Sequence, residues 1–231
     1  MLCFPQPLVS AQFVIRPNRF VIHADVGGEL ATVRCPSPGR MEELLTPNVE
    51  LLVHAPDNPD RRTDYTLVLI RHQRQWISID TQLPNRLFRH HLETGLLPMF
   101  ADTTSIQREV PIGASRIDFL LERRRGKPRL VEVKCCNLVD GGHGLFPDSP
   151  SHRASRHLRE LILARQEGFE PWVVFMITRV DAQSCGAHAL ADPLFAETLT
   201  RASKSGVRLK ALTHRVTRRG IALEREVPVL I

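Results

Sequence analysis

The stretch that decides the fold is Ser115-Arg-Ile-Asp-Phe-Leu-Leu-Glu122, followed after a turn containing Gly and Pro by Arg129-Leu-Val-Glu-Val-Lys-Cys-Cys136. Both runs are short and apolar, which is typical of β-strands, and the turn between them predicts a hairpin. Successive side chains of a strand point to opposite faces of a sheet, so Glu132 and Lys134 share one face. If the two strands pair, Asp118 lies beside Glu132.

Two carboxylates and an amine on one sheet face indicate a particular chemistry. Carboxylates a few ångströms apart in an apolar sheet repel each other unless a cation lies between them. Their oxygens suit Mg²⁺, or Mn²⁺ in its place, and Glu109 in the preceding strand is a candidate third ligand. Lys134 would stabilise a pentavalent phosphate or orient the attacking water. An ordinary solvated strand face gives the same pattern, but charges on a central strand are costly.

Outward from this hairpin, residues 84–231 alternate between helical and extended patterns. The predicted helices span Asn85–Phe100, about His152–Gly168 and about Asp192–Lys204. The other predicted strands are Ile106–Ile112, Trp172–Thr178, Val207–Val216 and Gly220–Val227. The run at 172–178 is almost wholly apolar, as expected for a strand covered on both faces. This order predicts a mixed sheet flanked by helices.

Residues 1–83 consist of short apolar runs separated by turn residues. The predicted strands are Val9–Arg16, Phe20–Val26, Glu29–Cys35, Val49–His54, Tyr65–Arg71 and Gln75–Ile79. Five or six short strands in about 80 residues fit a small closed barrel, most commonly of the OB type. Such barrels often bind nucleic acid along a strand face. Phe20, Tyr65 and Trp76 are therefore candidates either for base stacking or for the barrel core.

The charge of the chain is concentrated in its second part. The chain has 231 residues, of which 42% are hydrophobic and 24% charged, which excludes global disorder. Residues 1–80 hold 8 basic and 9 acidic side chains, whereas residues 81–231 hold 23 and 16. Only four of the basic residues are lysines. Arginine pairs bidentately with phosphates, which favours a nucleic-acid partner, although a solvated basic surface is the alternative.

Missing patterns exclude several classes of protein. No apolar run of about 18 residues predicts a transmembrane helix, and the first residues lack the features of a signal peptide. The five cysteines form no C-x-x-C pair, so reduced thiols in a cytoplasmic protein are expected rather than disulfides or a zinc ribbon. The phosphate-binding glycine motifs are absent, so no nucleotide cofactor is expected.

A set of short motifs runs through the chain in a fixed order. They are Pro36–Met41, Arg61–Thr66, Asn85-Arg86, Arg116–Phe119, Glu132–Lys134, Gly144–Asp148 and His157–Leu161. Together they resemble the sugar fermentation stimulation protein A (SfsA) family of bacteria and archaea. The resemblance implies an N-terminal OB-like β-barrel, residues 1–83, and a PD-(D/E)xK nuclease-like (restriction-endonuclease-like) α/β domain, residues 84–231. Asp118, Glu132 and Lys134 match the nuclease motif position by position, and Glu109 matches an acidic position ahead of it.

The family resemblance also implies non-specific DNA binding and a regulatory role in maltose metabolism. The residues expected to contact DNA are Arg61, Arg62, Arg86, Arg116, Arg153, Arg156 and His157. The last three fall on one polar face of the helix after the E-x-K strand, which flanks the cleft in nucleases of this class, although an ordinary solvated face is the alternative.

The leading interpretation is a DNA-binding protein with little sequence preference. The alternative is a Mg²⁺-dependent DNA nuclease in which Asp118 and Glu132 hold the metal and Lys134 assists the attack of water. A third interpretation is a binding module whose nuclease-like site is a relic. No membrane partner is expected in any of the three.

Overall fold

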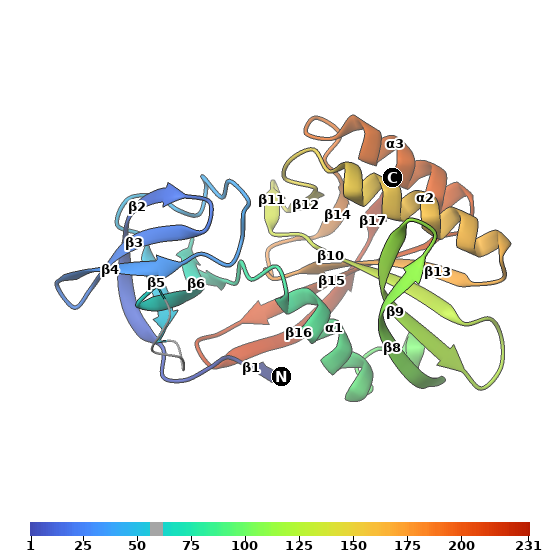
Figure 1. Cartoon of the computed structure of the whole chain (residues 1–231), viewed down its shortest axis with the longest axis horizontal. Helices are drawn as coiled ribbons and strands as arrows, with labels where there is room; N and C mark the ends of the chain where they lie inside the picture. The colour runs from blue at the N-terminus through green and yellow to red at the C-terminus, as the bar shows by residue number, and fades with distance from the viewer. Residues whose placement is uncertain (56–61) are drawn as a thin grey trace. The chain divides into compact units, whose positions relative to one another are not determined.

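The structure is a computed structural model that describes residues 1–55 and 62–231. The chain forms two compact units, of which the first comprises residues 1–82 with 214–222, and the second residues 83–213 with 223–231 (Figure 1). The return of 214–222 to the first unit is not visible in the sequence. It follows from the pairing of strand β1, Leu2–Cys3, with Gly220 and Ile221. In the part of the chain that the structure describes, no helix is both long and apolar enough to cross a bilayer.

The first unit contains a closed five-stranded barrel. Its strands are β2 (Val9–Asn18), β3 (Val21–Val26), β4 (Glu29–Arg34), β5 (Glu50–His54) and β6 (Tyr65–His72), and β7 (Gln75–Ile77) pairs with β6. The order is β4-β3-β2-β5-β6, and the pairing of β4 with β6 at Val33 and Tyr65 closes the ring. Because alternate side chains point inward, Ile22 and Ala24 of β3 are fully buried between half-buried neighbours. The predicted OB-like barrel is confirmed.

The second unit is an α/β domain, as predicted. Its helices are α1 (Leu83–Glu93), the 3-10 helix Pro98–Phe100, α2 (His152–Gln166) and α3 (Pro193–Lys204). Its strands are β8 (Thr103–Ile112), β9 (Ser115–Arg123), β10 (Arg129–Cys135), β11 (Leu138–Asp140), β12 (His143–Phe146), β13 (Glu170–Ile177), β14 (Ser184–Ala187), β15 (Arg208–Val216), β16 (Gly220–Val227) and β17 (Val229–Leu230). The main sheet has the order β1-β16-β15-β13-β10-β9-β8, and a smaller sheet has the order β11-β12-β14-β17.

Helices cover both faces of strand β10. Helices α2 and α3 lie side by side over one face (Figure 1), where Leu158 and Leu161 of α2 pack into a cluster with Val173 and Phe175 of β13. On the other face, Phe88 of α1 packs on Phe119 with ring centroids 5.1 Å apart. Strand β10 runs antiparallel to β9 and parallel to β13. It is therefore a central strand, and its charged residues lie inside the domain.

Two elements differ from the sequence-based expectation. The first helix ends at Glu93 rather than at residue 100, because Gly95 adopts a left-handed backbone with φ of 68° and stops it. The segment that contains Gly141, Gly142 and Gly144, for which no strand is predicted, forms the hairpin of β11 and β12. Gly141 and Gly142, with φ of 52° and 81°, supply the turn that an L side chain would strain.

Candidate metal and nucleic-acid site

The predicted hairpin of β9 and β10 brings the two carboxylates together at the point where the strands separate. The register pairs Leu130 with Leu120 and Val131 with Phe119, so the next residue along, Glu132, lies level with Asp118. The pairing stops there because the Asp118 carboxylate takes the place of a backbone acceptor. Its Oδ2 atom accepts a hydrogen bond from the backbone N–H of Val133 at 2.8 Å.

Asp118 is held from a second side by helix α1. The Asn85 side-chain amide donates a hydrogen bond to Oδ1 of Asp118 at 2.8 Å. Burial and the neighbouring Glu132 carboxylate raise the pKa of Asp118 to about 6, against the opposing effects of these two hydrogen bonds and of Lys134. The group is thus a carboxylate that carries its charge at a free-energy cost, which a nearby cation would remove.

Glu132 is 3% exposed, and its contacts with Lys134 and His157 are both made by the same carboxylate oxygen. Oε1 accepts from Lys134 Nζ at 2.7 Å and lies 2.5 Å from His157 Nδ1 on α2. Burial raises the pKa of Glu132, but Lys134 and His157 together lower it by more, so the pKa lies below its usual value. The other oxygen, Oε2, is buried and has no hydrogen-bond partner in the described residues.

His157 is oriented by a further contact on the same helix. The Nε–H of Arg153 lies 3.3 Å from His157 Nε2 and donates to it. The other ring nitrogen, Nδ1, therefore carries the proton and donates to Glu132. The helix begins just before these residues because the Ser151 hydroxyl caps the Ala154 N–H at 3.2 Å. The result is a chain of contacts from Arg153 through His157 to Glu132 and Lys134.

The carboxylate pair fits a divalent cation. A buried carboxylate oxygen without a partner is costly, and a second buried carboxylate beside it adds repulsion, so both observations favour a positive ion at this point. No cluster of three or more His, Cys, Asp or Glu side chains that would hold a metal occurs in residues 1–55 and 62–231. Mg²⁺ is commonly held by only one or two carboxylates and keeps several waters, so two ligands are sufficient.

Glu109 does not join the pair in this structure. It lies level with Asp118 along β8, because its neighbours Arg108 and Val110 pair with Phe119 and Ile117. Its backbone, however, is left-handed with φ of 55°, and its side chain is exposed. That backbone conformation is uncommon for a non-glycine residue and interrupts the strand pairing.

The candidate phosphate contacts are distributed over both units. In the second unit, Arg86 on α1, Arg116 on β9, and Arg153 and Arg156 on α2 are all exposed. In the first unit, Arg62 is exposed, and Arg61 lies outside the described residues. His157 differs from the expectation of an exposed phosphate contact: it is 2% exposed and faces Glu132. His157 points into the domain because it shares a helix face with the buried Ala154, Leu158 and Leu161.

Sequence reasoning missed the two side chains that position the carboxylates. Asn85 belongs to the Asn85-Arg86 motif, and a polar side chain at the start of a helix that precedes the hairpin is a usable signal for such a contact. The spacing of His157 from Arg153 predicts that it lies on the polar face of the helix, either as a DNA contact or on an ordinary solvated surface. His157 lies between Arg156 and Leu158, at the border of the polar and apolar helix faces. A residue at this border is compatible with either a buried or an exposed side chain, so the sequence does not decide between them.

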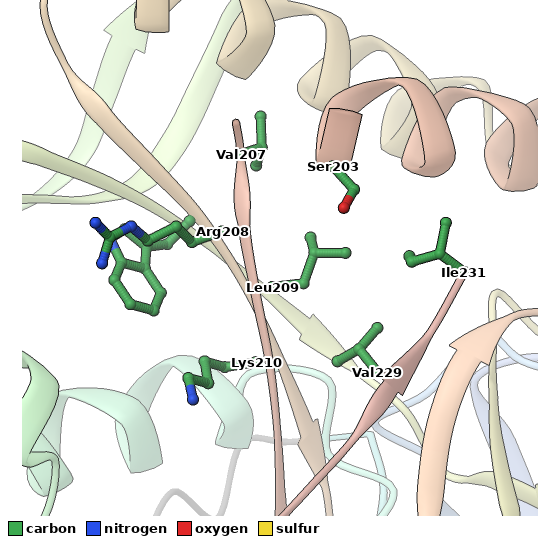
Figure 2. Close-up of a pocket in the computed structure, with 8 residues that line it drawn as sticks. Ser203, Val207, Arg208, Leu209, Lys210, Val229 and Ile231 are labelled. Carbon is green, nitrogen blue, oxygen red and sulfur yellow. The ribbon is translucent and has the colours of Figure 1, made fainter. Parts of the chain in front are cut away.

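One described cavity of about 450 Å³ is separate from this site. It is lined by residues at the start of β15 together with Trp172, Ser203, Val229 and Ile231. Figure 2 shows Arg208 and Lys210 on one side of β15 and Leu209 on the other. Both cations are paired within the fold, Arg208 with Glu170 at 3.7 Å and Lys210 with Glu226. Each cation of this cavity therefore has a carboxylate partner within the chain.

Comparison with known proteins identifies the family of the chain. The sequence model described as the SfsA N-terminal OB domain matches residues 14–79, and that described as the sugar fermentation stimulation protein RE domain matches residues 82–220. This chain belongs to the sugar fermentation stimulation protein family. The predicted resemblance to the SfsA family is confirmed.

Members of the SfsA family match over almost their whole length. The homolog from Moorella thermoacetica is 42% identical over 91% of this chain and 91% of its own, and that from Desulforamulus reducens is 39% identical over 96% and 92%. A solved structure, that of Pyrococcus furiosus SfsA in complex with Ca²⁺, is 29% identical with a TM-score of 0.90. It covers 98% of this chain and 97% of that one. Both units described above are therefore present together in an SfsA relative.

Proposed function

We propose that this SfsA-family chain binds DNA with little sequence preference and hydrolyses its phosphodiester bonds at the Asp118–Glu132 site with the help of a divalent metal ion. The observation that carries the proposal is the partnerless, buried Oε2 of Glu132 beside a carboxylate whose pKa is raised to about 6. A folded domain retains such a costly arrangement when a bound group compensates for it.

Each side chain would have a separate role at such a site. Asp118 and Glu132 would hold the ion, which when bound supplies positive charge to the phosphate and makes a water more acidic. Lys134 is held beside Glu132, and its ammonium has further N–H groups that can donate to a phosphate oxygen as negative charge develops there. His157 fixes the Glu132 carboxylate and keeps its Oε1 occupied.

The geometry of Glu132 favours a small ion over a large one. Lys134 and His157 both occupy Oε1, so only Oε2 is free to act as a ligand. A carboxylate that offers one oxygen suits Mg²⁺ or Mn²⁺, whereas Ca²⁺ often takes both oxygens of one carboxylate. The Pyrococcus furiosus relative in complex with Ca²⁺ supports a divalent-ion site in this family. For this chain we infer Mg²⁺ or Mn²⁺ as the working ion.

Binding of the DNA would rely on arginine–phosphate contacts. Four exposed arginines of the second unit, Arg86, Arg116, Arg153 and Arg156, lie on the strand and helices that hold the site residues. Contacts of this kind carry no sequence information and weaken as salt increases. The role in sugar regulation comes to this chain only through the family name, and the chemistry of the site favours a phosphodiester over a sugar.

The proposal is tested by incubating the full chain with plasmid and with short linear DNA in Mg²⁺, Mn²⁺ or EDTA. We expect cleavage only with metal, and at least a hundredfold loss in Asp118→Asn and in Lys134→Met. Calorimetric titration with Mn²⁺ separates the two variants, since Lys134→Met should still bind the ion and Asp118→Asn should not. DNA binding without cleavage by the wild type, in the presence of bound Mn²⁺, would reduce the site to a relic and leave only the binding function.

A further inference from the structure

We propose that the turn before β3 in the first unit is a platform for single-stranded nucleic acid, on which a base stacks against Phe20 and the adjoining phosphates contact Arg19, Arg34 and Arg40. The platform is distinct from the carboxylate site of the second unit. It extends the proposed function, because it assigns a second nucleic-acid contact, but it depends on a different set of observations.

The first observation is the exposure of Phe20. Its side chain is 61% exposed, whereas Trp76 is 8% exposed and Tyr65 is half-buried in the same barrel. Trp76 and Tyr65 are thus covered, fully or in part, by the rest of the barrel, whereas the Phe20 ring is open to solvent. Val14 and Ile15 of β2, at 48% and 56% exposure, add apolar surface on the strand that leads into this turn. An exposed apolar group of this size is commonly a contact surface.

The second observation is that the exposed ring is carried by a rigid backbone. The Arg16 guanidinium is not directed to solvent but donates four hydrogen bonds to carbonyl oxygens on two loops. These are the oxygens of Arg19 at 2.9 Å, Ser37 at 3.1 Å, Gly39 at 2.7 Å and Arg40 at 2.6 Å. One side chain therefore joins the β2–β3 turn to the segment that follows β4.

The backbone of Phe20 is fixed at both of its polar groups. Its N–H donates to Asn18 Oδ1 at 2.9 Å, and its carbonyl accepts from Cys35 N–H at 2.8 Å. Little conformational freedom of the main chain remains to be lost when a ligand binds. A rigid exposed aromatic group is the arrangement that gives affinity at low entropic cost.

The third observation is the charge around the ring. Arg19 precedes Phe20, Arg34 pairs with Val21 across β3 and β4, and Arg40 follows the segment that Arg16 holds; all three side chains are exposed. Glu42 and Glu43 follow Arg40, so the three arginines around the ring outnumber these two acidic side chains by one. Guanidinium groups bind phosphates, and an aromatic face stacks on any base. This combination fits a polyanion with free bases.

Single-stranded nucleic acid fits better than a duplex or a protein. In a duplex the base faces are stacked on each other and are not available to Phe20, whereas an unpaired strand exposes them. An acidic protein segment would satisfy the arginines but supplies no ring for Phe20. The same surface does not distinguish DNA from RNA, and both strands are included in the test below.

The test uses the full chain with Asp118→Asn, which prevents cleavage, in EDTA. Binding of fluorescein-labelled 15-mers of oligo(dT) and oligo(U) is followed by anisotropy at several salt concentrations. We expect Phe20→Ala to weaken binding about tenfold, in line with the loss of one base stack. Leu30→Ala is the matched control, because Leu30 is 68% exposed on the same barrel and should leave binding unchanged.

A second variant reports on stacking directly. Phe20→Trp should restore the affinity, and its additional fluorescence should be quenched when the oligonucleotide binds, whereas the two native tryptophans are buried and should respond little. Arg34→Ala should reduce the slope of log affinity against log salt by about one.

Equal affinities of Phe20→Ala and the parent, or absence of quenching in Phe20→Trp, overturn the inference. Tight binding of an acidic peptide with no oligonucleotide binding overturns it in favour of a protein partner. The outcome is independent of the proposed hydrolysis. A wild type that cleaves no DNA while Phe20→Ala loses oligonucleotide binding refutes the hydrolysis and leaves the platform standing.

Discussion

Replacing Asp118 by Asn should stabilise the metal-free protein while abolishing its metal site. The folded-state pKa of Asp118 is about 6, against 3.8 for an unperturbed aspartate. Below pH 3.8 the group is protonated in both the folded and the unfolded chain, so it costs nothing. As the pH rises from 3.8 through 6, the unfolded chain gives up a proton that the folded protein still holds, and stability is lost.

The magnitude follows from the size of the shift. About two pKa units correspond to about 3 kcal/mol at neutral pH, as an upper limit because the site is partly accessible to water. Asn is nearly isosteric, and a flip of the Asn85 amide restores a hydrogen bond to it. We therefore expect Asp118→Asn to raise the free energy of unfolding by about 1–3 kcal/mol at pH 7.5 in EDTA, and by about a third as much at pH 4.5.

The assay is urea unfolding followed by the fluorescence of Trp172, in a Trp76→Phe background that leaves a single reporter in the second unit. Asp102→Asn is the control with the opposite sign, because Arg123 and Arg129 lower the pKa of Asp102 and its charge is favourable. Mn²⁺ at a hundred times its dissociation constant should add about 2.7 kcal/mol to the wild type only. If Asp118→Asn is less stable than the wild type at pH 7.5, or if the difference does not change with pH, the assignment of Asp118 as a strained carboxylate is wrong.

Three further predictions concern the same unit. His157→Leu should weaken Mn²⁺ binding about 10–100-fold without loss of fold. His157→Asn keeps a donor in place of Nδ1, so its affinity for Mn²⁺ should stay within about threefold of the wild type. Equal effects of the two variants, measured by calorimetry, would contradict a positioning role. The affinity of the wild type for Mn²⁺ should fall as the pH drops below about 6, because the ion must displace a proton from Asp118, and a flat profile between pH 5 and 7.5 would exclude this. The double variant Arg153→Ala, Arg156→Ala should lower the salt slope of duplex binding by about two, and an unchanged slope would place the DNA elsewhere.

The sequence by itself determined the longer strands, their faces and the meeting of two carboxylates. Alternation along a strand is a local property, so Glu132 and Lys134 had to share a face, and a short turn had to return β10 beside β9. The barrel strands were equally readable from their length and their turn residues. Glu109 shows the limit of such reasoning, because one residue with a left-handed backbone interrupts the alternation and leaves its side chain exposed.

Only the tertiary structure decided which atoms complete the site and which surfaces remain open. The contact of His157 with Glu132 joins residues 25 positions apart on a helix and a strand, and it depends on how α2 packs against the sheet. The pKa of Asp118 depends on burial, which no spacing encodes. Phe20 and Trp76 are chemically similar residues of one barrel, yet one is exposed and the other buried. Periodicity fixes the direction of a side chain, but its environment arises only when distant elements exclude water together.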